Sequence, residues 1–382
     1  MRTVYLDNAA TSFPKPEGVS SSMKTYMDTV GATINRSVYG AAQDAGLTTL
    51  LLRESIAKFF HFPEPATHVI LTPGATAGLN MVIKGLLKSG DHCIVSAMEH
   101  NAVMRPVLQL AGVEFDRIPC SREGLMNPED LRPLIRPNTK LVVMAHGSNV
   151  CGAVQDAAAV GKICAEYNIP FVLDAAQTAG HIDIDFAGWG LSALVAPGHK
   201  GLLGPSGIGV MLLRDDFAQM LDPLIAGGTG SASDSEYLPA WLPDRFESGT
   251  PNLPGIYGLE ASMRFLQAEG LEKLHGHEMA LCARFLEGLK AIPGAVVCGP
   301  QGLENRVGVI SLDFPGQDNA EVAYRLETEF GILTRCGLHC APNAHKTLDT
   351  FPRGTVRFSL GFASTEEDVD YALDAIRAVA EI

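Results

Sequence analysis

Short apolar runs alternate with amphipathic stretches over the first two thirds of the chain, and this alternation constrains the fold more than any other feature. Apolar runs of strand length occupy residues 68–75, 91–98, 140–147, 169–176 and 191–198. Stretches with helical periodicity, each ending near Gly or Asn, occupy residues 77–91, 101–113 and 157–168. The alternation predicts an α/β fold with a mostly parallel sheet and helices on both faces. Ligands are then expected at the carboxyl ends of the strands.

A second structural unit is predicted near the end of the chain. After about residue 255 the pattern changes to one long helical run, then strands near 295–298, 306–313 and 355–360, and an acidic helix from about residue 365. A chain of 382 residues is long enough for more than one compact unit. We expect a large domain over residues 16–255 and a smaller α/β domain over residues 256–382, with residues 1–15 associated with the smaller one.

Charge and hydropathy exclude several classes of partner. The formal net charge is -14, and no basic patch is evident, so binding of nucleic acid is not expected. There is no run of about 18 consecutive apolar residues, the length that a membrane-spanning helix needs. The first residues also lack the apolar run of a signal peptide. These features predict a cytoplasmic protein with no membrane partner.

Two polar motifs lie where predicted strands end. Residues 71–83, LTPGATAGLNMVI, lead from a strand through small residues into a helix that begins around Thr76, and the free N–H groups at such a helix start can bind phosphate. The same turn also occurs for packing reasons alone. Asp174 ends a buried strand, where an ionised carboxylate needs a partner. The protonated ring nitrogen of a cofactor is one such partner; a helix N-cap or a structural ion pair is the alternative.

Lys200 directly follows an apolar strand and precedes a glycine-rich turn, in LSALVAPGHKGLLGPSGIGVMLL. A lysine amine with a lowered pKa can form an imine with an aldehyde cofactor, and a desolvated site rich in cations lowers the pKa in this way. A solvated lysine in a turn is the alternative. The ordered combination of a phosphate loop, an aspartate and a lysine favours the cofactor interpretation.

With these motifs the chain resembles the class V aminotransferase superfamily of fold-type I pyridoxal-phosphate enzymes, in its cysteine desulfurase and selenocysteine lyase branch. The resemblance runs almost from end to end, through the segments YLDNAAT, TPGATAGLN, MEHNAVMRP, SNVCG, DAAQTAG, GHKGLLGPSGIG, FESGTPN, TRCGLHCAP and VRFSLG. It implies pyridoxal 5'-phosphate as the cofactor and no metal. It also implies a large domain built on a mostly parallel, seven-stranded sheet.

The resemblance implies roles for four residues around the cofactor ring. Lys200 would form the internal aldimine, and Asp174 would pair with the ring nitrogen. Gln177 would hydrogen-bond the phenolic oxygen of the ring. His100 would stack on the pyridine face, although without the resemblance a helix-capping or buried structural histidine would be the preferred interpretation.

Further roles concern the phosphate and the substrate. The residues implied at the phosphate are Ala75, Thr76, His199 and, from the neighbouring subunit of a homodimer with shared sites, Thr250. The residue implied at the substrate carboxylate is Arg357, with Arg36 as a site-lining candidate. Asn149 would lie near both the ring oxygen of the cofactor and the substrate carboxylate. For Arg357 a surface salt bridge is the alternative. Relatives often have Ser just before Gly-His-Lys, and Pro197 removes that hydroxyl donor here.

Cys340 is the predicted nucleophile for sulfur. It follows His339, within reach of Arg335, in a segment whose Gly and Pro favour an exposed loop, and thiolates form where positive charge or an open polar loop lowers the pKa of a thiol. The branch carries its nucleophile in a similar Arg-x-Gly-x-His-Cys arrangement. The neighbouring Cys336 could be a packed bystander or a resolving thiol. A zinc site of Cys336, His339, Cys340 and His345 lacks the usual ligand spacing.

The resemblance implies a reaction in which L-cysteine becomes L-alanine and Cys340 takes the sulfur as a persulfide, with a sulfur-acceptor protein as a further partner. L-selenocysteine is the alternative substrate. Two other functions stay open, an aminotransferase or other lyase on the same fold and a non-catalytic sulfur-relay scaffold. The retention of Lys200, Asp174, Gln177 and His199 together disfavours the scaffold.

Overall fold

The main sheet of the protein has seven strands, and the computed structural model describes residues 2–34 and 39–380. The predicted site residue Arg36 therefore lies outside the described residues. In spatial order the strands are β2 (Val69–Thr72), β8 (Gly209–Leu213), β7 (Ala193–Pro197), β6 (Phe171–Asp174), β5 (Thr139–Ala145), β3 (His92–Ser96) and β4 (Glu114–Ile118). Within this sheet β8 alone runs antiparallel to its neighbours. The predicted α/β fold with a mostly parallel sheet is confirmed.

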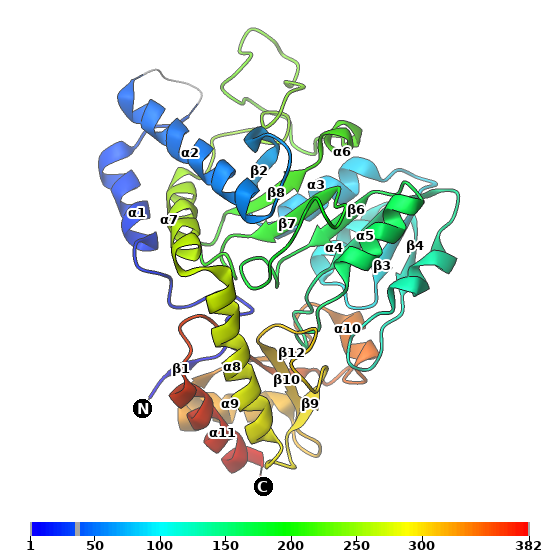
Figure 1. Cartoon of the computed structure of the whole chain (residues 1–382), viewed down its shortest axis with the longest axis vertical. Helices are drawn as coiled ribbons and strands as arrows, with labels where there is room; N and C mark the ends of the chain where they lie inside the picture. The colour runs from blue at the N-terminus through cyan, green and yellow to red at the C-terminus, as the bar shows by residue number, and fades with distance from the viewer. Residues whose placement is uncertain (1, 35–38, 381–382) are drawn as a thin grey trace.

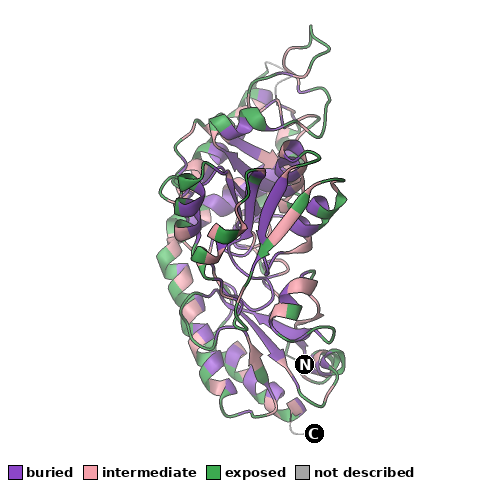
Figure 2. Ribbon diagram, turned by 90° about the vertical axis from the view of Figure 1, so that its right-hand side faces the viewer, coloured by how far each residue is buried: buried purple, intermediate pink, exposed green. Residues whose placement is uncertain are grey.

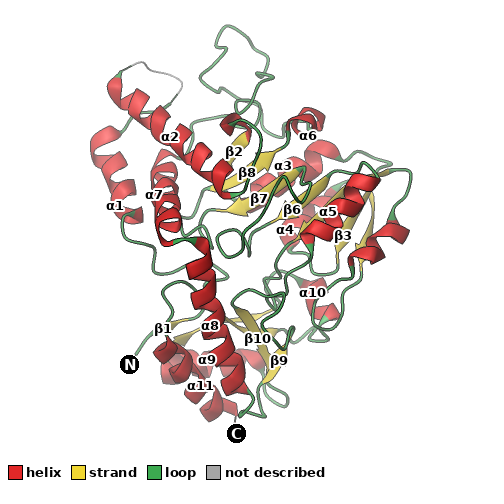
Figure 3. Cartoon of the chain, in the orientation of Figure 1, coloured by secondary structure: helices red, strands yellow, loops and turns green. Residues whose placement is uncertain are grey.

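Helices cover both faces of the main sheet, as Figures 1 and 3 show. Residues of α2 (Gly40–Phe59), α5 (Ala157–Glu166) and α7 (Leu253–Glu269) share one hydrophobic cluster with one side of the strands. Residues of α3 (Ala75–Leu86), α4 (Asn101–Gln109) and α6 (Asp215–Met220) share a second cluster with the other side. The short α1 (Val19–Thr25) continues into a π-helical turn, Tyr26–Val30, and packs on α7.

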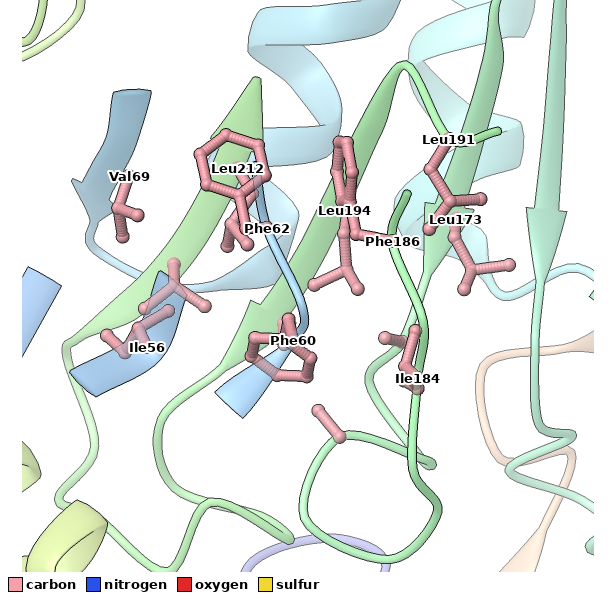
Figure 4. Packing of buried hydrophobic residues seen from close by; sticks show 14 of the residues in the cluster. Ile56, Phe60, Phe62, Val69, Leu173, Ile184, Phe186, Leu191, Leu194 and Leu212 are labelled. Atoms are coloured by element: carbon pink, nitrogen blue, oxygen red, sulfur yellow. The ribbon is translucent and has the colours of Figure 1, made fainter. Parts of the chain in front are cut away.

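The central strands are largely apolar because both of their faces are buried. In β5, Leu141 and Val143 belong to one cluster, whereas Val142 and Met144 belong to the other. This is the alternation that the geometry of a strand imposes. Figure 4 shows one of the two faces, where leucines of β6, β7 and β8 lie beside a group of phenylalanine rings. These uninterrupted apolar runs are the reason that the sequence indicates the strands so clearly.

A second sheet forms the lower part of the molecule in Figure 1. Its antiparallel strands, in spatial order, are β12 (Arg335–Gly337), β13 (Thr355–Ser359), β10 (Val309–Asp313) and β9 (Val296–Cys298). Three helices contribute to its separate hydrophobic cluster: α8 (Leu271–Leu289), α9 (Asn319–Phe330) and α11 (Glu366–Ala380). Figure 2 shows the buried residues gathered inside each of the two parts and many of the exposed residues on the outer helices and loops.

The predicted continuous helical run after residue 255 is two helices. Gly270, with a φ of 81°, lies between α7 and α8, and a positive φ is a conformation that glycine adopts without strain. Because α7 packs on α1 and α2, it belongs with the main sheet. The boundary predicted at residue 255 stays a prediction, and this packing favours a division near Gly270.

The first residues connect the two parts. β1 (Val4–Tyr5) pairs in parallel with β11 (Ile332–Leu333) of the second part, and the chain then passes to α1 beside the main sheet. Residues 6–15 therefore run along the junction. No helix among the described residues is long and apolar enough to cross a membrane.

Candidate active site

A cavity of about 500 Å³ opens at the carboxyl ends of the parallel strands, where the alternating pattern predicts ligand binding. Eight predicted site residues line it together: Ala75, Thr76, His100, Asn149, Asp174, Gln177, His199 and Lys200. These residues are up to 125 positions apart in the chain, from Ala75 to Lys200. The sheet brings them to one edge because β5, β6 and β7 all end there.

Lys200 lies at the floor of this cavity, just beyond the end of β7. The pKa of its amine is lowered to about 8, mainly by burial; Asp174 opposes the shift, and the positive charges of Arg357 and Arg335 add to it. Within residues 2–34 and 39–380, the structure shows no hydrogen bond or ion pair to the Lys200 amine. A buried amine with a lowered pKa is the form of lysine that can attack a carbonyl group near neutral pH.

Asp174 is the last residue of β6, Gln177 follows three positions later, and both line the same cavity. One carboxylate oxygen of Asp174 accepts a hydrogen bond from the Ala176 N–H at 3.0 Å, and its side chain is buried. Burial raises the pKa of Asp174, and the Ala176 N–H and Lys200 both oppose that shift. Gln177 donates one N–H to the carbonyl of Ala9 at 3.0 Å. Since an amide group carries two N–H donors, the second is left for a ligand.

The position of His100 fits both a helix cap and a residue beside the cofactor ring. It is the N-cap of α4, and its Nδ1 accepts a hydrogen bond from the Ala102 N–H at 3.0 Å, while the ring lines the cavity. Burial and, to a smaller extent, the positive charge of Lys200 lower the pKa of His100 to about 4. The ring is therefore neutral near pH 7, with Nε2 as its N–H, and it can lie against a flat ligand without adding charge.

The start of α3 and the side chain of His199 form another wall of the cavity. The first N–H groups of a helix have no partner within the helix, and α3 presents those of Ala75 and Thr76. Nδ1 of His199 is buried and has no hydrogen-bond partner in the described chain. Pro197 also lines the cavity, and as expected it offers no donor. This wall can therefore hold an anionic group through backbone and imidazole N–H donors.

Arg357 in β13 is held by groups from outside its own sheet. Its guanidinium donates to a carboxylate oxygen of Asp7 at 2.5 Å and to the carbonyl of Asn149 at 3.0 Å. The Asn149 side chain in turn donates to the carbonyl of His339 at 2.6 Å. Arg357 is 1% exposed, and its Nε has no partner. The predicted alternative, a surface salt bridge, does not fit this burial, and free N–H donors remain for a further carboxylate.

Removal of Asp7 is expected to destabilise the protein through Arg357. Asp7→Ala leaves a buried guanidinium without its counter-ion, so the free energy of unfolding in urea should fall by about 2 kcal/mol, less than for a fully buried pair because Asp7 is partly exposed. Asp28→Ala breaks the exposed pair of Asp28 with Lys24 and should cost less than about 1 kcal/mol. Equal effects of the two substitutions would contradict the importance of the Asp7–Arg357 pair.

Cys340 lies on an exposed turn at the edge of the site. Its carbonyl accepts a hydrogen bond from the N–H of Asn101 at 2.8 Å, which joins the turn to the helix that His100 caps. A guanidinium nitrogen of Arg335 lies 3.9 Å from its Sγ. Cys340 also has a φ of 58°, an uncommon value for a residue other than glycine. The turn thus presents the sulfur beside a cation.

Cys336 lies on the face of β12 opposite Arg335, because side chains alternate along a strand; it is Arg335 that lies beside Cys340. In β12, Arg335 pairs with Arg357 and Cys336 pairs with Val356, and Val356 belongs to the core of the second part. Burial raises the pKa of Cys336, and the negative charge of Asp318 adds to the effect. The segment from Arg335 to Gly337 is therefore a strand, where the sequence indicated a loop.

Two other predictions concern groups outside this cavity. Thr250 is exposed and lines an adjoining cavity of about 340 Å³, which shares Pro73 and Gly207 with the first.

Across the described residues, no group of three or more His, Cys, Asp and Glu side chains is placed to hold a metal ion.

Sequence reasoning missed Asp7 as the partner of Arg357. Its segment YLDNAAT carries part of the family resemblance, but an acidic residue in an irregular segment has no periodicity that would assign it a partner 350 positions away. The one available signal was its place beside apolar residues, since a carboxylate there needs a counter-ion.

Comparisons with known proteins agree with this geometry. The model of the family described as aminotransferase class-V matches residues 4–372. Probable cysteine desulfurases of Pyrococcus abyssi and Methanothermobacter thermautotrophicus are 33% and 30% identical to this chain, and each match covers 99% of the chain and 94% of the relative.

Two solved structures are also similar. A cysteine desulfurase from Thermococcus onnurineus has a TM-score of 0.91 and 31% identity, and the match covers 99% of this chain and 95% of that one. The cysteine desulfurase CsdA from Escherichia coli has a TM-score of 0.88 and 27% identity, with the same coverage.

A mostly parallel sheet with a lysine, an aspartate and an anion-binding helix start at its carboxyl edge defines an α/β enzyme of the pyridoxal-phosphate-dependent fold type I. The chain belongs to the aminotransferase class-V family. The resemblance to the cysteine desulfurases of this family is confirmed.

Proposed function

We propose that this chain is a pyridoxal-phosphate-dependent cysteine desulfurase that converts L-cysteine to L-alanine and holds the sulfur on Cys340. The observation that carries the proposal is the connection between the two ends of the site. The cavity with Lys200 and Asp174 is lined by His100, and the helix that His100 caps is hydrogen-bonded to the Cys340 turn.

The residues of the cavity fit the cofactor in their donor chemistry. The α3 start and the unpartnered Nδ1 of His199 are suited to a phosphate group. Asp174 offers a buried carboxylate to a ring nitrogen, and Gln177 has a free N–H for a ring oxygen. When bound, pyridoxal phosphate supplies an electron sink for the bond at the substrate's α-carbon. Lys200 is the residue that would hold its aldehyde carbon.

Substrate binding, proton transfer and attack on the sulfur would then be carried out by side chains of this chain. Arg357 would bind the substrate carboxylate through its free N–H donors, and the Lys200 amine would remove and return the α-proton. The Cys340 thiolate would attack the substrate sulfur. The carbon–sulfur bond of the substrate breaks as a sulfur–sulfur bond forms, so alanine leaves and Cys340 keeps one additional sulfur atom.

The direct test is incubation of the purified protein with L-cysteine and a thiol reductant. Alanine and sulfide should appear in equal amounts, without any keto acid. After a single turnover without reductant, mass spectrometry should find a gain of about 32 Da, one sulfur atom, on Cys340. Alanine that appears only when a keto-acid acceptor is supplied would show an aminotransferase instead.

The lowered pKa of Lys200 predicts how cofactor attachment depends on pH. Only the unprotonated amine attacks an aldehyde, and burial lowers the Lys200 pKa from 10.5 to about 8. In cofactor-free protein the attachment rate should therefore rise about tenfold per pH unit below this pKa and level off above it. Asp174→Asn removes the charge that raises the pKa, so its midpoint should lie lower. A wild-type midpoint near pH 10.5 would contradict the prediction.

A homodimer with shared sites is part of the proposal, and the position of Thr250 supports it. Thr250 does not line its own chain's cofactor cavity but is exposed beside it, as expected of a residue that serves a neighbouring subunit. Sedimentation at micromolar concentration should show a dimer. A sulfur-acceptor protein, L-selenocysteine as an alternative substrate and a cytoplasmic location stay predictions.

A further inference from the structure

Four hydrogen-bond donors converge on the backbone carbonyl of the residue before Lys200. The carbonyl oxygen of His199, which belongs to the same peptide group as the Lys200 nitrogen, accepts hydrogen bonds from the Ser12 N–H at 3.0 Å, the Thr11 hydroxyl at 3.1 Å and the Ser12 hydroxyl at 3.2 Å. The amine of Lys15 donates to the same oxygen at 2.9 Å. A carbonyl oxygen has two lone pairs, so four convergent donors exceed its ordinary share. We call residues 11–15 the strap.

Lys15 connects the donors of the strap to one another. Besides the His199 carbonyl, its amine donates to the Ser12 hydroxyl at 2.7 Å. A hydrogen bond from an ionised donor is about twice as strong as a neutral one. Loss of Lys15 would therefore remove the strongest of the four bonds and would also release the hydroxyl of Ser12.

Lys15 is partly buried, and its amine points at protein groups. Burial lowers the pKa of its amine to about 8, and in the part of the chain that the structure describes no carboxylate forms an ion pair with it. Lysine side chains normally extend their amine into water. Here the amine turns inward to a backbone carbonyl and a hydroxyl, both next to the cofactor cavity.

The backbone that directly follows Lys200 is also closely packed. A Cβ atom at Gly201 would lie 2.3 Å from the carbonyl oxygen of Ala179, and one at Gly180 would lie 2.0 Å from the carbonyl oxygen of Gly201. The Lys200 carbonyl also accepts a hydrogen bond from the Leu203 N–H at 2.8 Å. The backbone on either side of Lys200 in the chain is thus held, at His199 by the strap and at Gly201 by residues 179–180.

We propose that Lys15 is a positioning residue for Lys200: through the His199 carbonyl it fixes the backbone from which the reactive amine projects. The inference rests on the proposed function, in which Lys200 binds the cofactor and moves the α-proton. Displacement of a reacting group by about 1 Å can lower a rate by as much as about 100-fold. Lys15 itself does not line the cavity and so acts only through the strap.

The test compares Lys15→Met with wild type in two assays. The first assay starts from cofactor-free protein and measures the absorbance band at about 420 nm that the lysine–pyridoxal imine produces. In Lys15→Met, the rate at which this band appears after addition of pyridoxal phosphate should fall at least fivefold, to about 20% of the wild-type rate or less. In the loaded enzyme, kcat should fall about tenfold, whereas KM for cysteine should change less than about twofold, because Arg357 is untouched. Visible circular dichroism of the bound cofactor should change as well, since its orientation follows Lys200.

Two further variants separate positioning from stability. Lys15→Arg keeps a charged donor and should recover most of the attachment rate. Lys24→Met removes an exposed lysine of α1 that pairs with Asp28, and it should leave both rates unchanged. If Lys15→Met fails to fold, Lys15→Gln keeps a neutral donor and should give intermediate rates.

Wild-type rates and an unchanged circular dichroism spectrum in Lys15→Met would overturn the inference. A lower melting temperature with unchanged rates would overturn it too, because it would show a merely structural role. A wild-type protein that never forms the band would instead refute the proposed function, so the two failures are distinguishable.

Discussion

Replacement of Lys200 with alanine is expected to abolish the absorbance band near about 420 nm and to lower kcat with cysteine by at least about 1,000-fold. Lys200 supplies both the covalent link to the cofactor and the base for the α-proton in the proposed function, so no other group of the cavity replaces it. Absorbance spectra after addition of pyridoxal phosphate, followed by alanine quantification, measure both effects.

Lys290→Ala is the matched control for the Lys200 substitution. Lys290 is an exposed lysine that pairs with Glu287 at the end of α8, so its loss should change neither the spectrum nor the rate. Persistence of the band in Lys200→Ala would mean that another amine holds the cofactor, and the assignment of Lys200 would then be wrong.

Cys340→Ala should leave the absorbance band intact and reduce the formation of alanine from cysteine by about 100-fold or more, because the sulfur then has no nucleophile. An intact absorbance band with loss of alanine formation would show that Cys340 acts on the sulfur and not in cofactor binding. Single-turnover absorbance changes on addition of cysteine should still occur, since Arg357 and Lys200 remain in place.

Cys336→Ala provides the comparison within the same segment. Its side chain lies on the core side of β12, so substitution should keep at least about half of the wild-type rate. A loss of activity in Cys336→Ala as large as that in Cys340→Ala would contradict the bystander assignment and would favour a resolving thiol.

The cofactor half of the site could be predicted from the sequence because its groups follow strand ends. Asp174 and Lys200 each come directly after an uninterrupted apolar run, and the carboxyl ends of such runs meet at one edge of a parallel sheet. The edge strand β4, of sequence EFDRI, was missed because Ile118 is its only buried residue and its charged residues break the apolar run.

The contacts between the two parts of the chain could not be predicted in the same way. Arg335 and Arg357 lie opposite each other only through the register of β12 and β13, and strand register is set by packing rather than by local sequence. Asp7 and Lys15 lie in an irregular segment whose partners are more than 180 positions away. Such pairings depend on tertiary packing, which periodicity does not describe.

The path of the first residues has a consequence for synthesis of the protein on the ribosome. Val4 and Tyr5 pair with Ile332 and Leu333, and the Ala9 N–H donates to the Ser359 hydroxyl. The first residues to be synthesised therefore pair with residues that are synthesised near the end of translation. Multi-domain chains generally fold unit by unit as they emerge, and the main sheet can form on that schedule. The strap, however, stays anchored at only one end until β11 and β13 emerge. Full order in the cofactor cavity should therefore arise only after translation of most of the chain, which pulse-labelled nascent chains of increasing length would reveal.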